Sequence, residues 1–373
     1  MSATLPSASA FDSAPRSGRI WGQPGWGRAA RAVGLAATFA VPTVAQSPST
    51  VVTGKAYRFT RIAEGVYYAT STGSMVTGSN NVVIVGARDV MVVDTGTSPA
   101  AARAFVDDMK LVSSKPARYV VNTHFHYDHT DGNQVYAGKA DIIAHEYVKY
   151  ALENLDVLHI EPFRTSQLAN VPASVESLKR QMADEKDPGR LRALAQRLDV
   201  AERGWEELKE ITPTPPNVTY SKEKDVDLGG REVRLLFLGR GHTNGDTVVF
   251  LPRERVVATG DLMESQPAYM GNAQFDEWVA TLDALKRLEF DTVLPGHGAP
   301  FAGKALITAW QGYLTDLMRQ GAALKARGVS AADAARQVDL TRYSNDFSQI
   351  RGPGADLRGV QRLYEWIDEK ARQ

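Results

Sequence analysis

The chain of 373 residues contains no cysteine. Disulfide bonds, thiolate metal ligands and cysteine nucleophiles are therefore excluded, and any metal site must be built from nitrogen and oxygen ligands. Neither sign of charge is in excess, because 43 Lys and Arg residues balance 43 Asp and Glu residues. A balanced chain has no general attraction for nucleic acid or for an anionic membrane, so the expected partner is a small molecule and not a nucleic acid.

Histidine is also scarce, and its distribution is informative. Only seven histidines occur in the chain, yet three of them lie in residues 124–129, which read HFHYDH and follow the apolar run 119–121. A lone histidine is more often a core or loop residue than a ligand, but three imidazoles and a carboxylate in one turn would compete for few partners. The segment therefore predicts a metal site. Zinc suits these ligands, and iron and manganese also accept them.

The first 45 residues do not resemble the rest of the chain. A basic segment, 16–31, precedes an apolar stretch, 32–45, that ends in small residues. This order is typical of a secretory signal peptide, and a disordered leader is the alternative. The apolar stretch is short for a membrane span. We expect residues 1–45 to be a leader whose removal leaves a periplasmic or secreted protein without a stable membrane span.

Beyond residue 46 the pattern predicts alternating strands and helices. Runs of β-branched and aromatic residues bounded by Gly, Asn and Asp predict strands at 66–69, 81–85, 90–93, 119–122 and 233–237. Ser98 and Pro99 are typical of a helix start, and an apolar face follows them. The histidine-rich segment then lies at the carboxyl end of a strand, which is where sites collect in layered α/β folds.

Two further segments are predicted to be helical. In the first, residues 147–210, apolar side chains recur at steps of three and four from Leu191 to Leu208, and Pro188 separates this helix from an earlier one that begins near Ser174. A hairpin packed on the sandwich is the simplest interpretation, and a lid over the metal site is the alternative. The second segment, 303–373, is predicted to be a C-terminal helical extension, with helices at 303–327, 330–338 and 357–370.

Three isolated residues complete the candidate ligand set. His242, Asp261 and His297 each follow an apolar run and each has a glycine nearby. Such loops allow a side chain to reach a common centre, although each residue taken singly could be an ordinary loop residue. Together with residues 124–129 they form a set of seven nitrogen and oxygen donors.

At this point the sequence resembles the metallo-β-lactamase superfamily of metallohydrolases. The resemblance covers about residues 55–302 and rests on five motifs in order: Val93-Asp94-Thr95-Gly96, Thr123 to His129, Gly241-His242-Thr243, Gly260-Asp261 and Gly296-His297-Gly298. It implies an α/β fold, an αββα sandwich over residues 46–302, with two metals at one edge of its sheets. It further implies that His124, His126 and His242 bind the first metal, that Asp128, His129 and His297 bind the second, and that Asp261 bridges both.

The resemblance also implies an activity. A metal-dependent hydrolase with two divalent ions, Zn²⁺ being the expected metal, would use a metal-bound hydroxide on a carbonyl substrate: an ester, lactone, thioester or β-lactam. Asp128 would orient the hydroxide and is the predicted catalytic residue. Asp261 stands where one large group of β-lactamases has cysteine, which excludes the zinc-thiolate enzymes and resembles the thioesterases of the glyoxalase II type and the lactonases. The alternative is a metal-stabilised, non-catalytic binding or assembly protein of the same fold.

Several neighbouring residues are weaker candidates. Asp94, Thr243 and Asp246 are candidates for fixing the ligand imidazoles through hydrogen bonds. Candidates for the substrate pocket are Tyr127 and, in the connection after Asp261, Met263, Gln266, Tyr269, Met270 and Asn272. Loops of this kind often line sites, and simple loop packing is the alternative for each residue.

Overall fold

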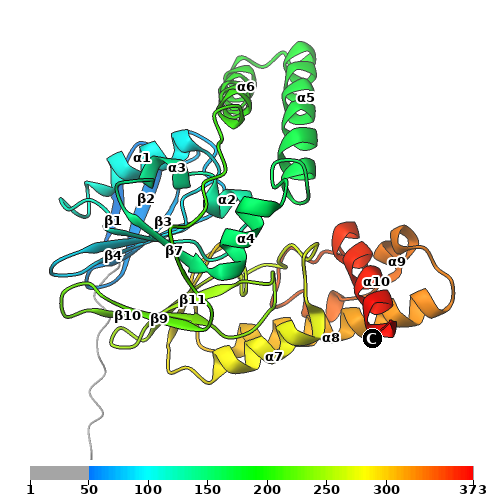
Figure 1. Ribbon diagram of the computed structural model, residues 1–373. Helices are drawn as coiled ribbons and strands as arrows, with labels where there is room; N and C mark the ends of the chain where they lie inside the picture. The colour runs from blue at the N-terminus through cyan, green and yellow to red at the C-terminus, as the bar shows by residue number, and fades with distance from the viewer. Residues whose placement is uncertain (1–49, 373) are drawn as a thin grey trace, which may run out of the picture. The chain divides into compact units, whose positions relative to one another are not determined.

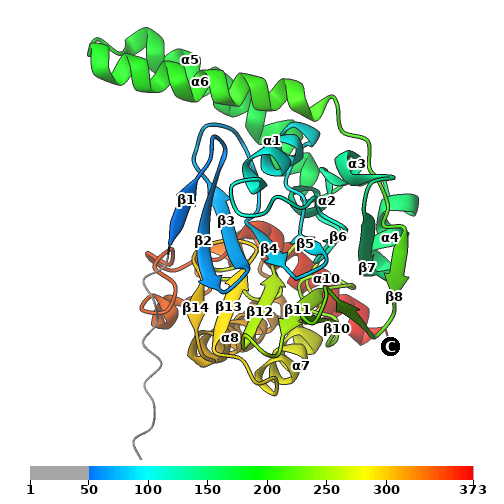
Figure 2. The same ribbon diagram turned by 90° about the vertical axis from the view of Figure 1, so that its left-hand side faces the viewer.

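The computed structural model describes residues 50–372, which form two β-sheets flanked by helices (Figures 1 and 2). The first sheet contains, in spatial order, β1 (Val51–Thr53), β2 (Tyr57–Ala63), β3 (Val66–Ser71), β4 (Asn81–Val85), β5 (Val90–Val93), β6 (Tyr119–Val121), β7 (Asp141–His145) and β8 (Val218–Tyr220). The second contains β14 (Phe301–Ala302), β13 (Thr292–Pro295), β12 (Val256–Gly260), β11 (Thr247–Leu251), β10 (Glu232–Phe237) and β9 (Glu223–Asp227). The predicted leader lies outside the described residues, so it and the predicted location stay predictions.

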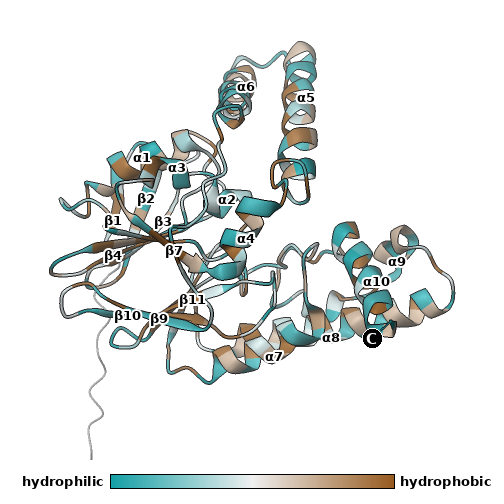
Figure 3. Ribbon diagram, viewed as in Figure 1, coloured by the Kyte–Doolittle hydropathy of each residue, from teal (hydrophilic) through white to brown (hydrophobic). Residues whose placement is uncertain are grey.

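The two sheets pack face to face because each of the central strands has apolar side chains on both of its faces. One face contributes to the core between the sheets and the other to the core under the helices. In β4 and β5, Ile84 and Met91 lie in the core between the sheets, whereas Val83 and Val92 belong to the core on the outer side. Side chains of a strand point alternately to its two faces, so a strand that is apolar at every position is buried on both. Figure 3 shows the hydrophobic colour in these strands.

Helices cover both outer faces of the sandwich. On the first sheet lies α1 (Pro99–Met109), which begins as predicted: the Ser98 side chain accepts a hydrogen bond from the Ala101 amide, and Pro99 occupies the first turn. On the second sheet lie α7 (Phe275–Lys286) and α8 (Ala305–Ala326), whose apolar residues share a core with the outer face of that sheet. This is the αββα order that the sequence predicted.

The order of the strands brings the candidate loops to one edge. In the first sheet β5, β6 and β7 are parallel, and in the second β12 is parallel to β13. Parallel neighbours end at the same edge, so the loops that follow β5, β6, β12 and β13 meet there. Small helices, α2 (Tyr127–Thr130) and α3 (Asn133–Tyr136), follow β6.

The predicted insertion consists of α4 (Glu146–Asn154), a π-helical turn η1 (Arg164–Ala169), α5 (Asn170–Asp184) and α6 (Pro188–Leu208). The break at Pro188 is confirmed, although α5 begins four residues before Ser174. The prediction that the hairpin packs on the sandwich is wrong for most of its length, because α5 and α6 extend away from the sheets (Figures 1 and 2). The two helices pack against each other, with Val175, Leu178 and Leu194 buried. The base of the hairpin contacts the sandwich, where the Ser98 and Glu207 side chains are 3.1 Å apart.

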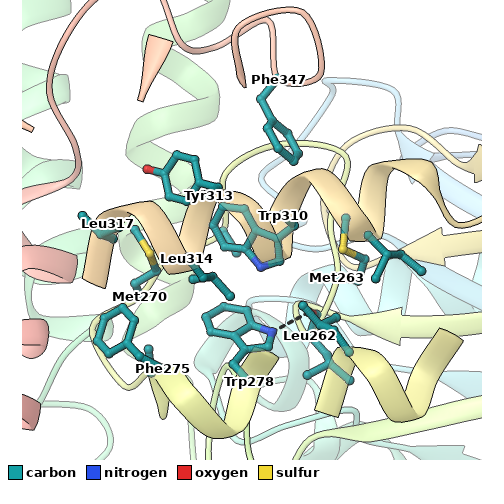
Figure 4. Packing of buried hydrophobic residues seen from close by; sticks show 14 of the residues in the cluster. Leu262, Met263, Met270, Phe275, Trp278, Trp310, Tyr313, Leu314, Leu317 and Phe347 are labelled. Carbon is teal, nitrogen blue, oxygen red and sulfur yellow. Dashed lines mark hydrogen bonds between the residues drawn. The ribbon is translucent and has the colours of Figure 1, made fainter. Parts of the chain in front are cut away.

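The C-terminal helices α8, α9 (Ala331–Gln337) and α10 (Leu357–Ala371) lie where the sequence predicted them, with a short helix η2 (Thr341–Tyr343) between the last two. Figure 4 shows Trp310 and Leu314 of α8 packed against Trp278 of α7. The Trp278 indole N–H donates to the Leu262 carbonyl at 2.8 Å. The extension is therefore part of the core that supports the residue next to Asp261.

Within residues 50–372, no helix has both the length and the apolar character that a membrane crossing requires.

Replacing Trp310, which is 1% exposed, by alanine is expected to lower the free energy of unfolding by about 3–5 kcal/mol, because the cavity would open at the centre of this core. Chemical denaturation measures the change. The control is Tyr150→Ala, which removes an aromatic ring that is 53% exposed and should change stability by less than about 1 kcal/mol. If the denaturation curve showed two unfolding transitions and Trp310→Ala shifted only one of them, the C-terminal extension would unfold separately from the sandwich.

Candidate metal centre

All seven predicted ligands lie at the edge where the strand ends meet. The loop after β6 carries His124 and His126, and α2 carries Asp128 and His129. His242 lies between β10 and β11, Asp261 follows β12, and His297 follows β13. All are buried except His297, whose side chain is 26% exposed. The structure thus brings together residues that are up to 173 positions apart in the sequence.

The donor atoms form two groups whose atoms lie within 4.8 Å of one another. In the first group, His126 Nδ1 is 2.9 Å from His124 Nε2 and 3.1 Å from His242 Nε2. In the second, Asp128 Oδ2 is 3.0 Å from His297 Nε2 and 3.6 Å from His129 Nε2. These are the two ligand sets that the resemblance implied.

The Asp261 carboxylate lies between the two groups. Its Oδ2 atom is 3.8 Å from His124 Nε2 and 3.6 Å from His242 Nε2. The Oδ1 atom is 3.4 Å from His129 Nε2, and Oδ2 is also 3.5 Å from His297 Nε2. One carboxylate therefore faces nitrogens of both groups, which is the position of a bridging ligand.

Hydrogen bonds on the outer side of three rings indicate which nitrogen of each carries the proton. His129 Nδ1 lies 2.8 Å from Asp94 Oδ2, and His126 Nε2 lies 2.9 Å from Asn272 Oδ1. Both partners are acceptors, so these nitrogens carry hydrogen and the nitrogens that face the cluster carry lone pairs. Orientation of a metal-binding imidazole by such a partner is the usual arrangement.

The third ring is held through a relay. Thr123 Oγ1 is 2.9 Å from Asp94 Oδ2 and 3.1 Å from His124 Nδ1. Its one hydrogen goes to the carboxylate, so the hydroxyl oxygen accepts from His124 Nδ1 and again leaves a lone pair facing inward. Asp94 therefore controls two ligand rings, one directly and one through Thr123.

The other two residues predicted to orient the imidazoles act differently. Asp246 accepts hydrogen bonds from the Thr243 amide at 2.9 Å and from its hydroxyl at 2.6 Å. These contacts brace the loop that carries His242, but His242 Nδ1 itself has no partner within residues 50–372. The sequence did not predict that Thr123 contacts the His124 ring or that Asn272 contacts the His126 ring. Thr123 adjoins the ligand motif, whereas nothing in the sequence links Asn272 to His126.

The inward-facing atoms fit a cation. His129 Nε2 and Asp261 Oδ1 are buried and have no hydrogen-bond partner in the described part of the chain. When His129 is neutral, its inward lone pair faces the Asp261 carboxylate across 3.4 Å, and either a proton or a divalent ion removes the repulsion between them. The donors are nitrogen and oxygen only, which suits zinc.

The histidines of the two donor groups differ in their pKa values because burial and nearby charges act on them differently. Burial lowers the pKa of His126 to about 4 and that of His242 to about 3, so both rings are neutral at neutral pH. Burial has the same effect on His129 and His297, but nearby carboxylates, with Asp261 the strongest contributor, raise the pKa of each well above its usual value. The second group therefore stabilises a positive charge, whether a proton or a metal ion, more than the first group does.

A cavity of about 190 Å³ opens over the donors. Its wall contains His126, Tyr127, Asp128, Pro162, Ser166, Asp261, Glu264, Gln266, Pro267, Tyr269, His297 and Arg358. Of the predicted pocket residues, Tyr127, Gln266 and Tyr269 thus line it. Met263 and Met270 do not, because both are buried in the core under α7 and α8.

The sequence did not predict that Glu264 and Arg358 line the cavity. Pro162 and Ser166 belong to the base of the insertion, so this base, and not the projecting hairpin, forms part of the pocket wall. The nearby Phe163 ring packs edge-on against Tyr127, with ring centres 5.5 Å apart.

The sequence is similar to those of several known proteins. The sequence profile of the metallo-beta-lactamase superfamily matches residues 75–297. A linear primary-alkylsulfatase of Pseudomonas sp. (strain ATCC 19151) is 27% identical over 231 residues, which are 58% of this chain and 40% of the relative. The 2,4-dinitroanisole O-demethylase subunit alpha of Nocardioides sp. (strain JS1661) is 25% identical over 219 residues, 57% of this chain and 51% of the relative. The chain thus spans about half the length of these relatives or less.

Among solved structures, a metallo-beta-lactamase from Pontibacter korlensis aligns with a TM-score of 0.49 and 17% identity, covering 70% of this chain and 99% of its own. The metallo-beta-lactamase DIM-1 aligns with a TM-score of 0.48 and 19% identity, covering 71% of this chain and 99% of its own.

Asp94→Asn is expected to weaken zinc binding at the group of Asp128, His129 and His297 by about 10- to 100-fold, because the amide no longer fixes the His129 ring as a carboxylate does. Asp94 has a φ of 61°, a conformation that asparagine tolerates. Calorimetric titration of zinc into metal-free protein measures the two affinities.

The matched control is Asp108→Asn. Asp108 is also a buried carboxylate and accepts from the amides of Ala56 and Tyr57 at 2.7 and 2.9 Å, but it contacts no ligand. It should lower stability and leave both zinc affinities unchanged. If Asp94→Asn bound both ions as tightly as the parent protein, Asp94 would have no role in orienting His129.

Lowering the pH from about 8 to about 6 is expected to weaken zinc binding at the group of Asp128, His129 and His297 more than at the group of His124, His126 and His242. The raised pKa values of His129 and His297 mean that both rings increasingly hold protons as the pH falls, and the metal must displace them. His126 and His242 take up protons only near pH 4 and pH 3, so the first group is little affected. Zinc titrations at several pH values test this, and an equal loss for both ions would contradict it.

Proposed function

Because the chain belongs to the metallo-beta-lactamase superfamily, we propose that it is a dinuclear zinc-dependent hydrolase of a small ester, lactone, thioester or β-lactam. The observation that carries the proposal is the position of Asp261, whose carboxylate faces His124 and His242 of one donor group and His129 of the other. A structural zinc site needs only one closed set of four ligands, whereas two sets that share a carboxylate and open into a cavity suit catalysis.

The chemistry of the donor set supports this assignment. Two divalent ions, when bound, would supply an activated water at neutral pH and would polarise the bond to be cleaved. The first donor group consists of neutral imidazoles with one shared carboxylate, and the second adds Asp128. The chain contains no cysteine that could act as a nucleophile. A water molecule is therefore the expected nucleophile.

Asp128 is the residue that we assign to positioning that water. Its Oδ2 atom lies between His297 and His129, and its side chain also lines the cavity. A carboxylate oxygen there can accept a hydrogen bond from the attacking water and fix its direction. The Ser79 hydroxyl donates to the Asp128 backbone carbonyl at 2.6 Å and helps to hold the residue in place.

Two tyrosines complete the polar wall. Burial raises the pKa of Tyr127 and of Tyr269, so both phenols keep their protons and can donate to a bound substrate. Pro162 and Pro267 contribute apolar surface to the same wall.

The substrate is proposed from the site alone. The names of the two relatives show that the superfamily also contains an alkylsulfatase and an O-demethylase. Because the chain spans 40% and 51% of those proteins, their reactions serve here only to widen the set of compounds to be tested, with an alkyl sulfate and an aryl methyl ether.

The purified protein is expected to contain close to two zinc ions per chain and to cleave at least one compound of a panel comprising nitrocefin, an acyl-homoserine lactone, a thioester, a carboxylic ester and the two additional compounds. Asp128→Ala should lower kcat by at least about 100-fold, because the nucleophile loses its orienting carboxylate. Metal analysis and steady-state kinetics measure both effects.

The control for this variant is Asp156→Ala, since Asp156 is exposed and its side chain bonds to His159 on the same loop. It should keep full activity. Undiminished activity of Asp128→Ala would refute the assigned role. Failure of the whole panel with two zinc ions bound would instead favour a metal-stabilised binding protein.

A further inference from the structure

Arg358 lines the metal cavity although it lies 61 residues beyond His297, in the first turn of α10. Among the described residues that line this cavity it is the only arginine or lysine. The other charged groups in the wall are carboxylates and the histidine ligands. Arg358 pairs with Asp356 at 3.2 Å, yet it is also the one fixed positive charge that the described part of this wall offers to a molecule in the cavity.

The start of α10 packs against the connection that follows Asp261. The guanidinium carbon lies 4.7 Å from the centre of the Tyr269 ring, which belongs to the connection after Asp261. At Gly359, an added Cβ would come within 2.9 Å of Met270, so the start of α10 approaches that same connection closely. Val360 and Leu363 are fully buried in the core beneath it. The fold thus brings Arg358 to the cavity wall through contacts within the protein.

Contacts within the protein use only part of the guanidinium. Its Nε and Nη2 atoms donate to Asp356 at 3.3 and 3.2 Å, while Nη1 has no hydrogen-bond partner in residues 50–372. The Asp356 carboxylate already caps α10 by accepting from the amides of Arg358 and Gly359. The helix end therefore does not need the arginine side chain. At 31% exposure the side chain remains open to a ligand.

We propose that Arg358 binds a carboxylate carried by the substrate at the end remote from the cleaved bond, which makes the preferred substrates anionic acyl compounds. The inference rests on the proposed hydrolase function. The fork of N–H donors matches the two oxygens of a carboxylate. Asp128, Asp261 and His297 lie on the wall of the same cavity of about 190 Å³, so one small molecule reaches both the reacting end and Arg358. With Asp128 and Asp261 engaged by cations, Arg358 would be the fixed positive group on the wall that an anion can reach.

The test compares p-nitrophenyl half esters of succinate, glutarate and adipate with the matching esters whose free carboxylate is a carboxamide. The zinc-loaded parent protein should cleave the best half ester with a kcat/KM about 10- to 100-fold above its neutral counterpart. Arg358→Met, which retains an apolar contact with Tyr269, should remove this preference through a higher KM for the half ester at unchanged kcat. Arg358→Lys should keep part of it, and the neutral ester should react equally with all three proteins.

Arg351→Met is the control, because Arg351 is an exposed residue of the loop before α10 and its loss removes the same charge without touching the cavity. It should behave as the parent protein. A parent protein without preference for the half esters, or an Arg358→Met variant that keeps the preference, would overturn the inference.

A binding measurement separates this inference from the hydrolase proposal. Calorimetry with glutarate and the zinc-loaded proteins should show about 10-fold weaker binding to Arg358→Met than to the parent protein and to Arg351→Met. Equal affinities would overturn the role of Arg358. If no ester of the series is cleaved, the hydrolase proposal fails on kinetics, while the glutarate affinities still decide whether Arg358 binds a carboxylate.

Discussion

Five imidazole rings and two carboxylates converge at one edge of the sandwich, and the fold must hold them there against the mutual repulsion of their lone pairs. Asp94 supplies much of the restraint, since its carboxylate binds His129 directly and His124 through Thr123. Close packing supplies the rest. At Gly296, an added Cβ would lie 2.2 Å from Asp261 Oδ1, so only glycine allows the loop after β13 to approach the central carboxylate. Rigid surroundings of this kind preorganise a metal site.

The core beneath the second sheet connects the C-terminal extension with this edge. Trp278 packs between α7 and α8 and donates to the carbonyl of Leu262, the residue after Asp261. Through the same core, α10 is held against Met270, and this contact places Arg358 on the cavity wall. The extension thus supports the site and also supplies one of its walls, so its packing and its proposed role in substrate binding have the same structural cause.

The insertion combines two different environments. Its base is ordered against the ligand loop, where Phe163 contacts Tyr127 and Ser166 lines the cavity. Its outer part is a hairpin of α5 and α6. Its buried apolar residues are Val175, Leu178 and Leu194. An amphipathic helix needs one apolar surface to pack on. The sequence pattern requires such a surface, but whether the sheet or the partner helix provides it is decided by the path of the chain.

Local patterns predicted much of the fold. Apolar runs such as 81–85 and 90–93 are strands whatever their partners, and the Ser98-Pro99 start of α1 acts through bonds within one turn. Strands such as β9, which reads EKDVD, could not be predicted, because pairing with β10 and not its own residues makes it a strand. β1 and β14 are short edge strands with the same dependence.

By itself the sequence determined the chemical identity of the centre. The absence of cysteine, the density of histidine in residues 124–129 and the glycines beside His242, Asp261 and His297 limit it to nitrogen and oxygen ligands on strand-end loops. Only the tertiary structure decided that Asn272 holds His126 and that Arg358 enters the cavity. Ligand chemistry is a property of side chains and their nearest neighbours, whereas these contacts join segments that only the packing of the two sheets and the C-terminal helices brings together.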